Sequence, residues 1–198
     1  ADKDGSKVDQ HITMIDKIVD MSKIDVGGKE VEGAEIQVVD KEGNVVDKWT
    51  SGKEAHKIKG LEEGKTYTLQ EVVTADGYVK ATDIEFTVTG ANSESKKENQ
   101  HIDMTDKIVD VVKNDVNDKA VKGATLQVVD KDDAVVDKWT TDGKAHKVKG
   151  LVEGQTYTLQ EVEPAEGYVK AADIQFTASG ADKDGSKVDQ HITMIDKI

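Results

Sequence analysis

Three ionisable residues, a lysine, a glutamate and an aspartate, each follow two apolar residues that stand two and four positions earlier in the sequence. Alternate side chains of a β-strand share one face, so each of these residues continues an apolar row. The rows are Val19, Met21 and Lys23; Tyr67, Leu69 and Glu71; and Ile102, Met104 and Asp106. We therefore expect these charged side chains to point into the fold rather than into solvent.

The second half of the chain repeats this arrangement with a second lysine, glutamate and aspartate. Its rows are Val109, Val111 and Lys113; Tyr157, Leu159 and Glu161; and Ile192, Met194 and Asp196. Positions of the opposite parity hold polar residues, which predicts a solvated outer face. In the first half these are Asp20, Ser22, Thr68, Gln70, His101 and Asp103.

Burial of one ammonium and two carboxylates in a small core costs several kcal/mol per ion. Desolvation lowers the pKa of a lysine and raises that of a carboxyl group, so the charges can be removed by proton transfer. A neutral amine beside a protonated carboxyl group is arranged for nucleophilic attack. If Lys23 attacks Asp106 while Glu71 moves the protons, loss of water leaves an amide. The alternative is a buried salt-bridge network that does not react.

The elements that position these residues belong to a repeat. Residues 1–18 recur letter for letter as residues 181–198, and a looser copy, ENQHIDMTDKI, occupies residues 98–108. The period of about 90 residues is fixed without a gap. The chain is thus interpreted as an orphan terminal strand of a preceding repeat (1–18), a first unit (19–108) and a second unit (109–198).

Within the first unit, short segments of alternating apolar and polar residues are separated by Gly, Asp and Asn, which is typical of β-strands. Strands are predicted at 19–26, 34–40, 45–50, 55–58, 66–73, 84–89 and 101–107. Seven short strands indicate an all-β, immunoglobulin-like sandwich. Residues 40–44 predict a hairpin turn in which Gly43 or Asn44 takes positive φ. The equivalent residues 130–134 lack the glycine, so we expect a less favourable turn.

Composition excludes several classes of protein. A net charge of −13 argues against nucleic acid and anionic membranes as partners, because phosphate binding needs clustered Lys and Arg. The absence of cysteine excludes disulfides and thiolate metal sites. No apolar run is long enough to insert into a membrane, and no signal peptide opens the sequence. Residues 106–110 join the units without a flexible tract, which predicts a stiff head-to-tail rod.

The strings SKID, KEVEGA, YTLQEV and DGY, followed by HIDMTDKI, resemble the Cna B-type (SpaA-like, prealbumin-like) domains of Gram-positive surface adhesins and pilins. Within that family they are most similar to the SpyTag/SpyCatcher parent domain. The resemblance implies intramolecular isopeptide bonds, with Lys23 and Lys113 matching the reactive lysine. Glu71 and Glu161 match the catalytic glutamate, and Asp106 and Asp196 the reactive aspartate.

The sequence departs from the family pattern at two places. The usual Ala-Pro before the Gly-Tyr turn is Thr74-Ala75 in the first unit and Pro164-Ala165 in the second, which changes a loop. Most of the family uses Asn as the acyl partner, whereas this chain has Asp. Water rather than ammonia would therefore leave.

We expect structural stalk repeats of a cell-surface adhesin or pilus-like protein, extracellular and attached to the cell wall, with no cofactor and only single-turnover autocatalysis. Expected partners are neighbouring repeats of the array and, through other domains, a host or matrix protein. One alternative is a ligand-binding adhesin module with recognition loops, and another is an engineered array of one consensus unit. Asp16 lies in the orphan strand and is a candidate for reaction with another molecule.

Further candidates have simpler interpretations. Asn99 precedes the last strand of the first unit and could rival Asp106 as acyl partner, but we interpret it as a turn residue. No two of the five histidines have metal-ligand spacing, so they are assigned to the solvated surface. Residues 182–186 are similar to a calcium loop but lack its closing Glu and are assigned to a turn. The aromatic residues Trp49, Trp139, Tyr78 and Tyr168 could form a ligand platform, but packing is the preferred interpretation.

Overall fold

Strands form all of the regular structure that a computed structural model of the chain describes. The described residues are 16–89, 99–178 and 188–197, and they contain no helix. Accordingly, none of them belongs to a helix with the length and apolarity needed to cross a membrane. The predicted all-β class is confirmed.

The first unit consists of seven strands in two sheets. They are β1 (Val19–Asp25), β2 (Glu35–Val39), β3 (Val45–Thr50), β4 (His56–Lys57), β5 (Thr66–Val73), β6 (Ile84–Thr87) and β7 (Gln100–Asp106). One sheet has the order β4-β1-β7 and the other β3-β2-β5-β6. All seven strands lie at the positions that alternation predicted, with ends that differ by at most two residues.

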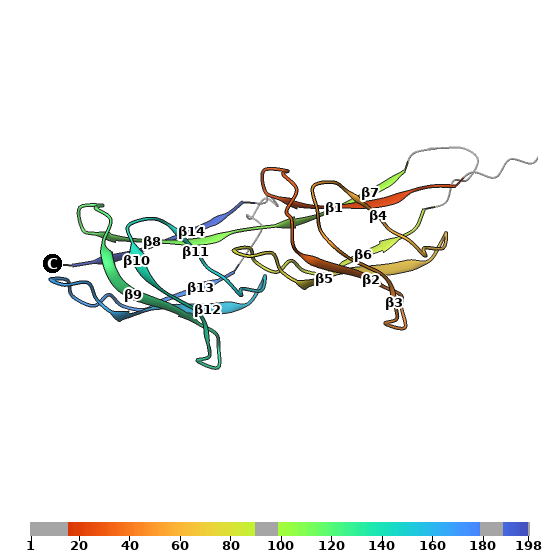
Figure 1. The fold of residues 1–198 in the computed structure, drawn as a ribbon. Coiled ribbons are helices and arrows are strands. Elements are labelled where there is room, and N and C mark those ends of the chain that lie inside the picture. Colours follow the sequence, from red (N-terminus) through yellow and green to blue (C-terminus); the bar gives the residue numbers. More distant parts are fainter. Residues whose placement is uncertain (1–15, 90–98, 179–187, 198) are drawn as a thin grey trace, which may run out of the picture.

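The second unit repeats this topology. Its strands are β8 (Val109–Asp115), β9 (Lys122–Val129), β10 (Val135–Asp142), β11 (His146–Lys147), β12 (Thr156–Glu163), β13 (Ile174–Thr177) and β14 (Gln190–Asp196). Its sheets have the orders β11-β8-β14 and β10-β9-β12-β13. The two sandwiches lie end to end, and β7 leads directly into β8 (Figure 1).

The first and last strands of each unit are neighbours and run parallel. In the first unit β1 pairs with β7 over its whole length, with Lys23 opposite Met104 and Asp25 opposite Asp106. In the second unit β8 pairs with β14 in the same register, with Lys113 opposite Met194. The alternation of side chains had placed Lys23 and Asp106 on inward rows, but it did not predict that their two strands are parallel neighbours.

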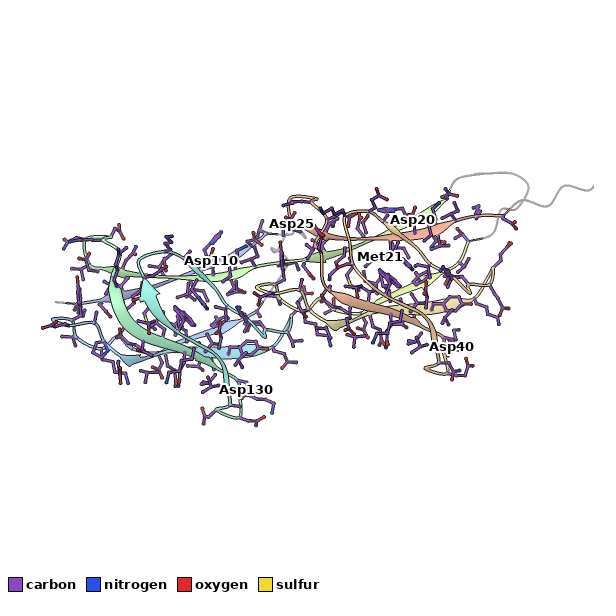
Figure 2. The ribbon with its side chains drawn as sticks, in the orientation of Figure 1. Asp20, Met21, Asp25, Asp40, Asp110 and Asp130 are labelled. Atoms are coloured by element: carbon purple, nitrogen blue, oxygen red, sulfur yellow. The ribbon has the colours of Figure 1, made fainter. Side chains whose placement is uncertain are left out.

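The core of each unit lies between its two sheets. In the first unit Met21, Ile36, Leu69 and Met104 are almost completely buried. Met21 points inward while its neighbour Asp20 points away from the core (Figure 2). These apolar rows form the walls around the buried lysine, glutamate and aspartate.

One prediction for the outer face is wrong. Ser22 has the outward parity, yet it is buried, and its hydroxyl donates a hydrogen bond of 2.6 Å to Glu30 Oε1. The loop after β1 folds back over the strand, with Ile24 bridged to Glu30 and the Val31 N–H bonded to the Lys23 carbonyl. This loop covers the face that alternation alone assigns to solvent.

The hairpin turns behave as predicted. Asp40 and Asp130 lie at the tips of the β2–β3 and β9–β10 hairpins (Figure 2). Gly43 has a φ of 84° in the first turn, and Asp133, which replaces it in the second, has a φ of 60°. A non-glycine residue in this left-handed region is strained, so the second turn is the less favourable one.

Candidate functional site

Lys23, Glu71 and Asp106 come together in the interior of the first unit. Lys23 is on β1 and Asp106 ends the parallel neighbour β7, so both side chains leave the same face of one sheet. Glu71 is on β5 of the opposite sheet. The sandwich therefore closes the glutamate over the lysine and the aspartate.

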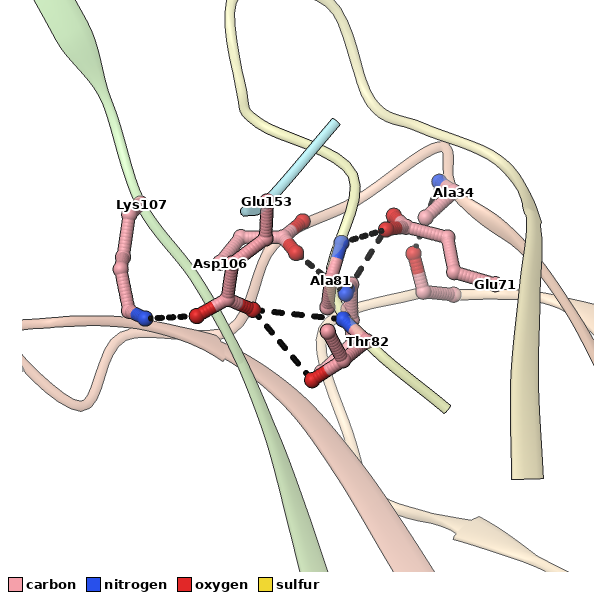
Figure 3. Close-up of polar contacts among 9 residues, drawn as sticks. Ala34, Glu71, Ala81, Thr82, Asp106, Lys107 and Glu153 are labelled. Carbon is pink, nitrogen blue, oxygen red and sulfur yellow. Dashed lines mark hydrogen bonds and ion pairs between the residues drawn. The ribbon is translucent and has the colours of Figure 1, made fainter. Parts of the chain in front are cut away.

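The three side chains are in direct polar contact. The Lys23 ammonium donates a short hydrogen bond to Asp106 Oδ1, and Lys23 Nζ lies 3.3 Å from Glu71 Oε1. The other oxygen of Glu71 accepts the backbone N–H of Ala81 at 2.8 Å (Figure 3). This last bond fixes the orientation of the glutamate toward the lysine.

The second unit builds the same site from equivalent residues. Lys113 Nζ lies 2.5 Å from Asp196 Oδ1 and 3.1 Å from Glu161 Oε1. Glu161 Oε2 accepts the N–H of Ala171 at 2.6 Å. The two units thus agree in every contact within the cluster.

Both clusters are removed from solvent and incompletely hydrogen-bonded. The side chains of Lys23, Glu71 and Asp106 are 0% exposed. Within the described structure one oxygen of each carboxylate, Glu71 Oε1 and Asp106 Oδ2, has no hydrogen-bond partner, and the same holds for Glu161 and Asp196. Buried polar atoms without hydrogen-bond partners are uncommon in folded proteins.

The pKa of the aspartate is shifted toward the protonated form. Burial raises the pKa of Asp106 to about 7; the Lys23 ammonium opposes this rise and the nearby Glu71 carboxyl adds to it. Burial also raises the pKa of Asp196, again opposed by Lys113 and assisted by Glu161. Since three ionised groups would leave a net negative charge in the core, a proton on the aspartate neutralises the cluster.

This arrangement has the parts that amide formation needs. The amine nitrogen of Lys23 contacts the carboxyl group that it would attack, and Glu71 lies within reach of the same nitrogen to accept and return a proton. A carboxylic acid is also a better acyl donor than a carboxylate. The surrounding apolar core excludes the water that would compete.

Asn99 and Asp16 lie apart from this cluster. The Asn99 side chain accepts the N–H of Ile18 at 3.1 Å, and Asp189 accepts that of Ile108 at 2.8 Å in the second unit. These side chains tie the start of each unit to its last strand, a role that the sequence did not indicate. Asp16 is exposed just before β1, and residues 1–15 and 182–186 lie outside the described residues.

The histidines and tryptophans have structural contacts. His101 on β7 bonds Asp20 of β1 and Asp103, and the Asp20 bond raises the pKa of His101. Trp49 stacks on His56 with ring centroids 4.0 Å apart, and Trp139 stacks on His146 in the same way. In the described parts of the chain, no three His, Asp or Glu side chains are grouped so as to hold a metal ion.

Three residues near the cluster were not identified by the alternation of apolar and polar residues in the sequence. Ala81 supplies the backbone donor to Glu71, and Lys107 and Glu153 form an ion pair of 2.8 Å beside Asp106. Glu153 belongs to the second unit, so its proximity to the first could not follow from local alternation. The sequence offered one indication that these two residues matter, which is their recurrence in the repeat. Glutamate recurs at positions 63 and 153, and lysine recurs at 17, 107 and 197.

The two units match a known family over most of their length. Residues 17–102 and 107–193 each match the family described as SpaA, prealbumin-like fold domain. A comparison with curated proteins gave no match.

Solved structures that are similar to this chain at low identity include two pilins and a Bacillus anthracis protein. The shaft pilin SpaA from Lactobacillus rhamnosus GG is 14% identical, with 91% of this chain and 97% of that chain covered and a TM-score of 0.36. The Bacillus anthracis TIE protein is 20% identical over 91% of this chain, which spans 34% of that protein, with a TM-score of 0.36. A streptococcal ancillary pilin is 19% identical over 90% of this chain and 62% of that chain, with a TM-score of 0.40.

Proposed function

The chain belongs to the SpaA family of prealbumin-like fold domains, and we propose that it supplies structural stalk or shaft repeats to a bacterial cell-surface adhesin or pilus-like protein. Each unit is locked by an autocatalytic isopeptide bond, between Lys23 and Asp106 in the first and between Lys113 and Asp196 in the second. The array acts outside the cell, attached to the cell wall, with neighbouring repeats as its immediate partners.

The observation that carries this proposal is the contact between a fully buried lysine and a fully buried aspartate on the first and last strands. The Lys23 ammonium bonds Asp106, with Glu71 3.3 Å from the same nitrogen. An unreacted network would keep the charges of Lys23 and Glu71 in the core, together with two carboxyl oxygens that have no hydrogen bond. Amide formation removes all of these charges at once.

The reaction is a condensation in which atoms and protons balance. With Asp106 protonated, Glu71 takes a proton from the Lys23 ammonium and frees the amine. The amine attacks Cγ of Asp106, and a C–N bond forms. Glu71 then passes a proton to the departing hydroxyl group as the C–O bond breaks, and one water leaves. The nitrogen gives up its second proton to Glu71, which ends as a neutral carboxylic acid, so the cluster is neutral before and after the reaction.

A bond at this place stabilises the unit in two ways. It closes a loop between residues 83 positions apart, and by analogy with disulfides such a cross-link stabilises by about 4.5 kcal/mol. It also connects the strand where tension enters to the strand where tension leaves. Force passes through the amide and into β8, and the rest of the sandwich is not stretched.

Intact mass spectrometry of the denatured chain tests the proposal. We expect the mass to fall below that of the sequence by two water molecules. Lys23→Ala and Lys113→Ala should each restore one water, and a digest should contain a branched peptide that joins Lys23 to Asp106.

Lys48→Ala is the matched control, because Lys48 is a half-exposed lysine paired on the surface with Glu35. This variant should keep both water deficits. A wild-type chain with the full sequence mass would leave only the unreacted salt-bridge network and would refute the proposal.

A further inference from the structure

Glu153 of the second unit lies between two segments of the first unit. Its Oε1 accepts a hydrogen bond of 2.8 Å from Lys107 Nζ, and its Oε2 accepts from the Thr82 N–H at 3.3 Å and the Thr82 hydroxyl at 3.4 Å (Figure 3). Partial burial opposes ionisation, but the Lys107 and Thr82 contacts together lower the pKa of Glu153. The carboxylate is therefore ionised at neutral pH.

Backbone contacts hold the same two units together. The Lys80 N–H donates to the Leu151 carbonyl at 2.8 Å, and the Glu153 N–H donates to the Lys80 carbonyl at 3.1 Å. Val79 of the first unit packs into the hydrophobic core cluster of the second, which includes Leu151. The junction is thus a packed, hydrogen-bonded contact rather than a single covalent link.

Each residue that Glu153 holds is the chain neighbour either of Asp106 or of Ala81, the backbone donor to Glu71. Thr82 follows Ala81, whose N–H orients Glu71, and Lys107 follows Asp106. Val79 and Lys107 are joined by a backbone hydrogen bond of 2.8 Å, so the two segments form one support. Glu153 and Leu151 of the second unit contact these two segments.

The second unit provides an internal comparison, because the equivalent segments of its own site carry no such cover in the described chain. Val79 is 3% exposed, whereas Val169 is 61% exposed. Lys107 is buried and Lys197 is exposed; Ala81 is buried and Ala171 is half-buried. Position 172 is alanine, so the hydroxyl that Thr82 offers to Glu153 is missing there.

We propose that the second unit positions the bond-forming site of the first, with Glu153 as the positioning residue. Glu153 holds Ala81 and Asp106 in place through their chain neighbours. This inference rests on the proposed isopeptide chemistry and adds to it a coupling between successive units.

A time course of bond formation tests this coupling. The chain is synthesised in a cell-free translation mixture, stopped at intervals in acidic denaturant and digested, and the two cross-linked peptides are measured separately. Glu153→Ala should slow the bond of the first unit on the order of tenfold, and that of the second unit should be unchanged. Glu153→Gln keeps the acceptor for Thr82 but loses the charge that pairs with Lys107. Its rate for the first bond should lie between the rates of wild type and Glu153→Ala.

Glu63→Ala is the matched control, because Glu63 is the equivalent glutamate of the first unit and is exposed. It should change neither rate. Thr82→Ala introduces the residue that the second unit already has at position 172, so it preserves the fold. It should slow the first bond by less than Glu153→Ala does.

A pH profile distinguishes positioning from general destabilisation. The groups that face Asp106 are Lys23 from β1, Glu71 from β5 and Tyr78, whose own pKa is raised first by burial and then by nearby aspartates that include Asp106. If Glu153→Ala admits water, the midpoint of the pH profile for the first bond should move to lower pH.

Equal rates and an unchanged midpoint in wild type and Glu153→Ala would overturn the coupling while the bonds themselves remain. A wild-type chain that never loses water would instead refute the proposed function.

Discussion

At the scale of residues, the chemistry of the Lys23, Glu71 and Asp106 cluster depends on which of the three side chains are protonated. The lysine contacts both carboxyl groups, and burial raises the pKa of Asp106 to about 7. The site can therefore become neutral near physiological pH. Its chemistry depends on the glutamate for proton transfer and on the aspartate for the acyl group.

Replacement of the glutamate should stop the chemistry and leave the fold. Glu71→Gln keeps an oxygen for the Ala81 N–H but cannot accept a proton from Lys23. Loss of a general acid–base group costs a factor of about 100 to 10,000. We expect the chain to show a deficit of one water, from the second unit, in intact mass spectrometry. Glu62→Gln, an exposed glutamate paired with Lys65, is the control and should retain two.

The raised pKa of Asp106 also predicts how the rate depends on pH. Below about pH 7 the folded site holds Asp106 as the acid, which is the form that the amine attacks. As the pH rises through about 7, the group becomes a carboxylate and the rate of the first bond should fall. The time course measured between pH 5 and pH 9 checks this. A rate that increases steadily across that range would contradict the assignment.

At the scale of elements, the hairpins show how one residue changes a turn. Asp40 Oδ1 accepts the N–H groups of Glu42 and Asn44, and Asp130 Oδ1 accepts those of Asp132 and Ala134. Both turns are therefore closed by the same aspartate side chain. They differ at the residue with positive φ, which is glycine only in the first unit.

Asp133→Gly should stabilise the second unit by about 0.5 kcal/mol, because relief of the left-handed strain exceeds the entropy that glycine loses on folding. The measurement is urea unfolding followed by the fluorescence of Trp139, in a chain where Trp49 is replaced by phenylalanine. Gly43→Asp is the reverse change and should destabilise the first unit by a similar amount, read from Trp49 in a chain where Trp139 is replaced by phenylalanine. A lower midpoint for Asp133→Gly would show that the strain is absent.

At the scale of the whole molecule, the path of force determines what the repeats can do. The first strand of each unit lies beside its last strand, and β7 of the first unit continues directly into β8 of the second (Figure 1). With both amides formed, tension passes through β1, the cross-link and β7 to the second unit. The packed junction at Val79 and Glu153 adds lateral support between units.

Pulling single molecules by their ends should separate linked from unlinked units. The wild-type chain should show no unfolding extension within either cross-linked loop. Lys23→Ala should add one event of roughly 25–30 nm, the extended length of about 83 residues, and Lys113→Ala should add one of equal size. An event of this length in the wild-type chain, after the water deficits are verified, would contradict the mechanical role.

The sequence by itself determined the repeat, the all-β class, the strand positions and the inward parity of Lys23, Glu71 and Asp106. These follow from short-range periodicity, because alternate side chains of a strand must face opposite ways. Tertiary structure decided that β1 and β7 are parallel neighbours, that Ser22 is covered, and that Glu153 reaches across to Lys107 and Thr82. Those features depend on which distant segments pack together, and the local alternation of side chains does not predict such contacts.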